Sequence, residues 1–244
     1  MTINITADQA AATVIQTLPV SATVPATKTA PAGTAEGNSL PVLNVTKRKS
    51  LPTGVASNVK QFCGLLLDTS SSMSLDSKID ELNASVAPFI AELADPRNKD
   101  GFRLSIVEFN HVARLVCSAQ SAQNLTVPLL NADGGTNFDS PINMIINEIE
   151  AYMSAPNPEG WHKLRPHVIM MSDGQASVSD QNIQRLQELA DVTAVAYGTD
   201  ADEGTLSRIS SDGQVHIVGV DGSQLRSFLQ AVGRTMTDTM AQNI

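Results

Sequence analysis

The chain has 244 residues and a formal net charge of −9, and 42% of its residues are apolar, which is enough for a full-sized globular core. The acidic charge argues against a nucleic-acid partner, because phosphates attract clustered Lys and Arg and repel carboxylates. No apolar run reaches the roughly 18 residues of a membrane span, and the first residues lack the basic and apolar segments of a signal peptide. We therefore expect a cytoplasmic protein that binds neither nucleic acid nor a membrane.

Residues 1–58 differ in composition from the rest of the chain. They contain no Phe, Tyr or Trp, and they are rich in Ala, Thr, Pro, Ser and Val without helical or strand periodicity. Such a segment cannot bury enough apolar surface to offset its ordering entropy. We predict an N-terminal tail over 1–58, disordered alone or ordered by a partner, followed by a folded domain over 59–244.

Strand and helix signals alternate after the tail. Residues 62–67 form a continuous apolar run that ends at Asp68, as expected of a strand buried on both faces. Apolar residues then follow helical spacing over 79–93, and two strand-like segments, 104–109 and 112–117, are separated by a short turn typical of an antiparallel hairpin. Further helices are predicted within 142–149, 183–189, 203–209 and 225–236, and further strands at 168–171, 192–197 and 215–218.

This alternation predicts an α/β fold with a doubly wound, mostly parallel sheet, one antiparallel strand and helices on both faces. Cys63 and Cys117 fall inside strand-like runs, which favours buried free thiols over a disulfide. Ligands of open α/β sheets bind beyond the carboxyl ends of the strands. The polar residues that follow the predicted strands are therefore the candidates for a functional site.

Three polar segments can reach that edge of the sheet. Residues 68–72 follow the first strand, residues 134–137 precede the second long helix, and residues 172–174 follow the Met-rich strand. Their two carboxylates and three hydroxyls are hard oxygen donors, which suit Mg²⁺, Mn²⁺ or Ca²⁺, and a cation would let two carboxylates converge. The candidate metal-binding residues are Asp68, Ser70, Ser72, Thr136 and Asp173.

These motifs resemble those of the von Willebrand factor A (vWA) family, whose metal-ion-dependent adhesion site (MIDAS) combines Asp-x-Ser-x-Ser, a Thr in a second loop and an Asp in a third. The resemblance covers about residues 61 to 240 and includes all five candidate positions. It implies a Rossmann-like fold, direct metal contacts from Ser70, Ser72 and Thr136, and contacts from Asp68 and Asp173 largely through bound waters. An open coordination position would then accept an Asp or Glu of a partner protein.

The residues in the Gly-Gly-Thr and Ser-Asp-Gly motifs look closest to those of compact bacterial intracellular vWA members, including those associated with tellurite resistance. This resemblance suggests a role in a stress response. One position departs from the pattern. Ser71 stands where intracellular relatives commonly have Gly, and a positive φ there would strain the loop slightly.

The resulting hypothesis is a non-catalytic, divalent-metal-dependent protein-binding module. One alternative is an assembly or scaffold protein that self-associates by docking its tail on a neighbouring subunit. A Mg²⁺-dependent phosphohydrolase is disfavoured, because such enzymes usually need a second Asp two residues after the first and a Lys nearby, and Ser70 occupies the position of that second Asp. The chain also lacks a phosphate loop, a nucleophile elbow and a Cys/His nucleophile pair, so no catalytic apparatus is recognisable. A structural alternative is that the hydroxyls after Asp68 only cap the following helix.

Overall fold

The computed structural model of the chain describes residues 58–157, 160–198, 201–219 and 222–242. The tail predicted for residues 1–58 lies, apart from Asn58, outside the described residues and stays a prediction. None of the described helices is long and apolar enough to cross a membrane.

The elements follow one another largely as the sequence pattern predicts. In chain order they are β1 (Val59–Asp68), the 3-10 segment η1 (Ser71–Ser77), α2 (Lys78–Leu93), η2 (Pro96–Asn98), β2 (Phe102–Phe109), β3 (Ala113–Ser121), η3 (Ala122–Asn124), α3 (Asp139–Ser154), β4 (His162–Lys163), β5 (His167–Ser172), α4 (Asp180–Leu189), β6 (Asp191–Tyr197), α5 (Glu203–Ile209), β7 (Val215–Val218) and α6 (Gly222–Gln242).

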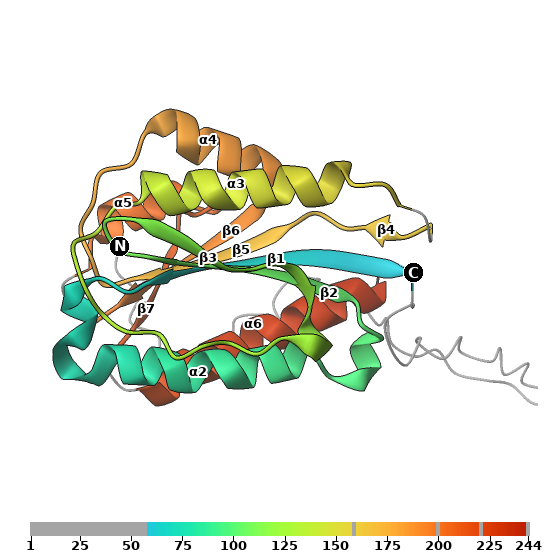
Figure 1. Cartoon of the computed structure of the whole chain (residues 1–244), viewed down its shortest axis with the longest axis horizontal. Coiled ribbons are helices and arrows are strands. Elements are labelled where there is room, and N and C mark those ends of the chain that lie inside the picture. Colours follow the sequence, from blue (N-terminus) through green and yellow to red (C-terminus); the bar gives the residue numbers. More distant parts are fainter. Residues whose placement is uncertain (1–57, 158–159, 199–200, 220–221, 243–244) are drawn as a thin grey trace, which may run out of the picture. The chain divides into compact units, whose positions relative to one another are not determined.

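The strands form one sheet in the order β3-β2-β1-β5-β6-β7, with the short β4 paired to the start of β1. β1 is parallel to both of its long neighbours, β2 and β5, and β3 alone runs antiparallel, beside β2. The predicted α/β fold, with a mostly parallel sheet and one antiparallel strand, is therefore confirmed (Figure 1). The strand order reverses between β1 and β5, which is where ligands bind in open α/β sheets.

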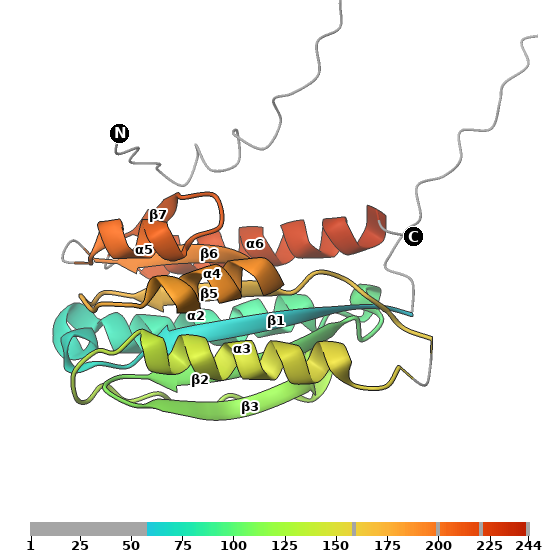
Figure 2. The same ribbon diagram turned by 90° about the horizontal axis from the view of Figure 1, so that it is seen from above.

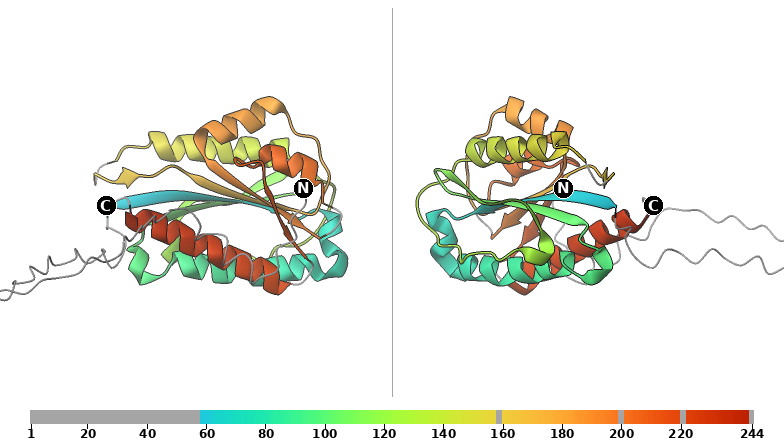
Figure 3. Two further views of the ribbon diagram at one scale, coloured as in Figure 1. Left: turned by 180° about the vertical axis from the view of Figure 1, so that it is seen from behind. Right: turned by 45° about the vertical axis from the view of Figure 1, so that its right-hand side comes forward.

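Helices cover both faces of the sheet. Figures 1 and 3 show α3, α4 and α5 on one face and α2 and α6 on the other, and Figure 2 shows the first group from above. All ten residues of β1 are buried as a result. Because side chains alternate along a strand, Leu65 and Leu67 pack toward α2 and α6 while Phe62 and Leu66 pack toward α3.

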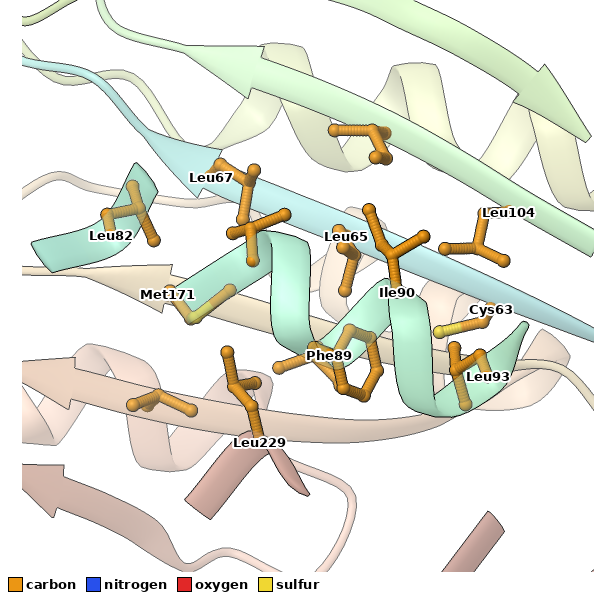
Figure 4. Packing of buried hydrophobic residues seen from close by; sticks show 14 of the residues in the cluster. Cys63, Leu65, Leu67, Leu82, Phe89, Ile90, Leu93, Leu104, Met171 and Leu229 are labelled. Carbon is orange, nitrogen blue, oxygen red and sulfur yellow. The ribbon is translucent and has the colours of Figure 1, made fainter. Parts of the chain in front are cut away.

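Helix α2 buries the stripe that its spacing predicts, including Leu82, Phe89 and Leu93. Figure 4 shows Phe89 near Leu65, Met171 and Leu229, which belong to β1, β5 and α6 and to the same buried cluster. Phe89 is fully buried, and full burial of such a side chain contributes roughly 1.5–3 kcal/mol to stability. The short segment η1 lies between the end of β1 and the start of α2.

Among the remaining local predictions, the hairpin and the free cysteines are confirmed, whereas the end of β3 and the presence of β4 differ from the prediction. The hairpin between β2 and β3 is confirmed, and its turn is closed by a hydrogen bond from the Asn110 N–H to the Val112 carbonyl at 2.9 Å. Cys63 and Cys117 are free and buried, as predicted. β3 extends four residues beyond its predicted end at Cys117, to Ser121, with register shifts against β2, and β4 was not predicted. Both differences involve segments without a clean apolar alternation.

Candidate metal centre

The candidate site begins with Asp68, the last residue of β1, whose carboxylate is fully buried. Its Oδ1 accepts a hydrogen bond from the Ser70 N–H at 2.8 Å, and its Oδ2 accepts one from the Ser172 hydroxyl at the end of β5. Ser172 Oγ accepts in turn from the Gly174 N–H at 2.9 Å. The first and third predicted loops are thus joined through one buried carboxylate.

Burial raises the pKa of Asp68 above its ordinary value, although the hydrogen bonds from Ser172 and Ser70 oppose this and the nearby Asp173 carboxylate adds to it. A carboxylate in this position is costly to hold in the charged form. A cation beside it would favour the charged form, as the sequence argument expects of two converging carboxylates.

The two serines of the first loop connect Asp68 to Asp173. Ser70 Oγ lies 3.0 Å from Ser72 Oγ, and the Ser72 hydroxyl donates to Asp173 Oδ1 at 2.8 Å. Ser70 occupies the N-cap position of η1 but makes no side-chain cap hydrogen bond. The helix-capping interpretation is therefore wrong for Ser70, because its hydroxyl is directed to Ser72.

The second loop brings Thr136 to the same point. A Cβ added to Gly174 would lie 2.8 Å from Thr136 Oγ1 and 3.3 Å from Asp68 Oδ2, so both oxygens lie against this glycine. The loop is tied to η1 by Ser71, whose N–H and hydroxyl both donate to the Gly134 carbonyl, at 2.9 and 2.7 Å. Gly134 itself has a φ of +74°, which favours glycine. The structure therefore brings together all five residues predicted from the sequence.

The expected strain at Ser71 is wrong. Ser71 is not among the described non-Gly residues with positive φ, and its side chain stabilises the neighbouring loop instead. The left-handed residues of this segment are Asp76 and Ser77, with φ of 52° and 58°. Each costs about 1–2 kcal/mol, and together they turn the chain from η1 into α2.

Lys78, the residue that follows this turn, is a site residue that the sequence argument missed. Its Nζ lies 2.7 Å from Asp173 Oδ2, and the side chains of Lys78 and Asp173 are only 2% and 0% exposed. A lysine at the start of a surface helix is ordinarily solvated, and nothing in the local pattern marks this one as buried. The Asp173 carboxylate thus accepts from Ser72 on one oxygen and from Lys78 on the other.

The donor set fits a small hard cation. The described residues contain no group of three His, Cys, Asp or Glu side chains that could hold a metal, so a metal here must also use hydroxyl oxygens. Ser70, Ser72 and Thr136 supply three such oxygens beside Asp68 and Asp173. Oxygen-only sites of this kind suit Mg²⁺, Mn²⁺ or Ca²⁺.

The surface around the site is partly apolar and partly hollow. Leu75 in η1 and Val112 in the β2–β3 turn are 58% and 57% exposed, and both belong to loops that contact the site. An open depression of about 440 Å³ begins at Gln175, directly after the third loop. It is lined by Gln175, Ala176, Ser177, Val178, Asp202, Thr205 and Arg208.

The fold and the site together define a Rossmann-like α/β domain that gathers oxygen donors at its topological switch point. The family model of the von Willebrand factor type A domain matches residues 64–231, and the chain belongs to this family. A search of curated proteins found no match.

Several solved structures share the fold. Proximal thread matrix protein 1 from the mussel byssus, in a structure described as having a zinc-occupied MIDAS motif, aligns with a TM-score of 0.55 and 19% identity over 72% of this chain and 47% of that one. A von Willebrand factor type A protein from Catenulispora acidiphila gives 0.57 and 18% over 72% and 42%. The vWF domain of the pilus tip protein Mfa5 from Porphyromonas gingivalis gives 0.57 and 12% over 76% and 97%. This chain thus spans less than half of the first two.

Proposed function

We propose that the domain is a non-catalytic protein-binding module that holds one divalent cation and engages a carboxylate of its partner through it. The observation that carries the proposal is the convergence of all five predicted oxygen-bearing residues at the switch point of the sheet. Mg²⁺ is the proposed ion, with Mn²⁺ and Ca²⁺ as alternatives. The zinc-occupied MIDAS of the mussel protein supports a divalent ion at a site of this kind.

The hydrogen bonds of the two carboxylates support a division of roles. Asp68 and Asp173 already accept two hydrogen bonds or ion-pair contacts each, from the first loop, Ser172 and Lys78. In the proposed arrangement Ser70, Ser72 and Thr136 contact the metal directly and the two aspartates act largely through bound waters. Neutral hydroxyl ligands leave the cation strongly attractive to an Asp or Glu of the partner.

The alternatives have less support. A phosphohydrolase would need Asp68 as an accessible nucleophile, whereas its carboxylate is fully buried and hydrogen-bonded on both oxygens. A scaffold role through residues 1–58 is compatible with the metal-dependent module and stays a prediction. The same holds for a cytoplasmic location and for the bacterial tellurite-resistance type, since the similar structures include a byssus matrix protein and a pilus tip protein.

If the domain binds a metal, the metal should stabilise the folded state. We expect Mg²⁺ or Mn²⁺ to raise the melting temperature, because a ligand bound only by the folded state adds about 2.7 kcal/mol at a hundred times its Kd. Ser72→Ala should remove most of this rise. Ser74→Ala is the matched control, since the exposed Ser74 hydroxyl donates to the Ser71 carbonyl of its own turn. A full metal response in Ser72→Ala would place the metal elsewhere.

Partner binding should depend on Thr136. Thr136→Ala removes a direct ligand without changing the formal charge, so we expect it and chelation each to weaken a captured protein complex at least about tenfold, or 1.4 kcal/mol. Thr235→Ala on the exposed side of α6 serves as the control, because its hydroxyl donates to the Ala231 carbonyl of the same helix. Full affinity of Thr136→Ala in the presence of chelator would show that the complex does not form through a metal.

A further inference from the structure

The Asp173 carboxylate has a fixed positive neighbour that the metal hypothesis does not require. Lys78 Nζ lies 2.7 Å from Asp173 Oδ2, while the Ser72 hydroxyl donates to Oδ1 at 2.8 Å. A hydroxyl that donates to Asp173 Oδ1 still has lone pairs for a metal, and Lys78 contacts the other oxygen, Oδ2, so the lysine does not occupy the Ser72 oxygen. The ammonium can therefore remain in place when the site is loaded.

Lys78 is held there by the fold. Its side chain is 2% exposed, and it directly follows the left-handed pair Asp76 and Ser77, which sets the direction in which α2 begins. Phe89 of α2 is fully buried in a cluster that includes residues of β1, β5 and α6, which holds the helix against the sheet. A lysine placed in this way puts its ammonium group beside Asp173 Oδ2.

We propose that Lys78 sets the balance between metal affinity and affinity for an anionic partner, an inference that rests on the proposed metal-binding function. Asp68 and Asp173 alone would neutralise a divalent cation. The Lys78 ammonium adds one positive charge 2.7 Å from one of these carboxylates, so the loaded site is less negative than it would be without the lysine. Like charges at short range in a buried site interact strongly, so the metal binds more weakly and an incoming carboxylate binds more tightly.

The proposal predicts opposite changes in two affinities. Lys78→Met should raise the affinity for Mn²⁺ at least about tenfold, measured by calorimetric titration of the full chain. It should also weaken the binding of acetate to the Mn²⁺-loaded protein, measured by the acetate concentration that displaces metal-bound water in water-proton relaxation. A residue that only supports the packing would weaken both affinities when replaced, because the site would lose its geometry.

Matched variants separate the possible outcomes. Lys99→Met removes one exposed positive charge at the opposite end of the sheet, before β2, and should change neither affinity. Lys78→Gln keeps a hydrogen-bond donor but no charge and should behave as Lys78→Met does, with sucrose added if either variant is too unstable. Failure of both to fold even then would assign Lys78 a packing role and overturn the proposal.

The failure of this inference is distinguishable from failure of the proposed function. Unchanged or weaker Mn²⁺ binding by folded Lys78 variants, beside normal binding by the parent protein, would overturn only the role of Lys78. Absence of Mn²⁺ binding in the parent and in all variants would overturn the metal site itself and this inference with it.

Discussion

Asp173→Ala is expected to lower the free energy of unfolding by about 3–5 kcal/mol in the presence of chelator, because it removes the carboxylate that lies 2.7 Å from the buried Lys78 ammonium. The exposed ion pair between Arg165 and Asp191 offers a comparison within the same chain. Loss of that pair through Asp191→Ala should cost only about 0–1 kcal/mol, because both side chains are about half exposed and the pair is already screened by water.

Urea denaturation followed by circular dichroism measures both values. The double variant Lys78→Met, Asp173→Leu should regain part of the loss, since apolar side chains often replace a buried ion pair without a net cost. A loss below about 1 kcal/mol in Asp173→Ala would mean that Lys78 reaches water or another partner once Asp173 is gone.

The ion pair between Lys78 and Asp173 determines which substitutions can test the metal site. Asp173→Ala would alter the metal response and the stability of the metal-free protein at once, so a lost response could not be assigned to metal binding alone. Ser72→Ala and Thr136→Ala remove hydroxyls and leave the ion pair between Lys78 and Asp173 intact. They are the cleaner tests of the proposed ligands.

The fold could be predicted from the sequence because its elements have strong and different periods. The continuous apolar run of β1 reflects a strand covered by helices on both faces, and the spacing of apolar residues in α2 matches the stripe that it buries. β4 has only two residues, and β3 shifts its register around Ala119, which has a φ of 40°. Neither feature has a periodicity that a sequence pattern can express.

The convergence of the candidate site could be predicted because its loops directly follow or precede elements at one edge of the sheet. Asp68 ends β1, Asp173 follows β5, and Thr136 lies just before α3. Lys78 could not be predicted, because its contact with Asp173 joins residues 95 positions apart and depends on the left-handed turn before α2. Burial of a single lysine is a property of tertiary packing that the local sequence does not carry.

Substitution of Gly174, in the third loop, is expected to have a large effect on metal affinity. A Cβ at Gly174 would lie 2.8 Å from Thr136 Oγ1, 3.0 Å from Thr136 Cγ2 and 3.3 Å from Asp68 Oδ2. Real Cβ atoms essentially never approach other atoms below 3.0 Å, so Thr136 must move away. The displaced group is a proposed direct metal ligand, and the space that the methyl group fills lies beside two of the site's oxygens.

We therefore expect Gly174→Ala to reduce Mg²⁺ or Mn²⁺ affinity by up to about a hundredfold, the upper end of the effect of disturbing groups around a metal. Overpacking should lower the free energy of unfolding by only about 1–3 kcal/mol, so the domain stays folded. Gly135→Ala is the matched control, because a Cβ there meets nothing within 4 Å although Gly135 adjoins Thr136. Calorimetric titration of Mn²⁺ into the two variants measures the difference. Equal affinities in Gly174→Ala and Gly135→Ala would show that Thr136 Oγ1 does not contact the metal, since its displacement would then have no effect on binding.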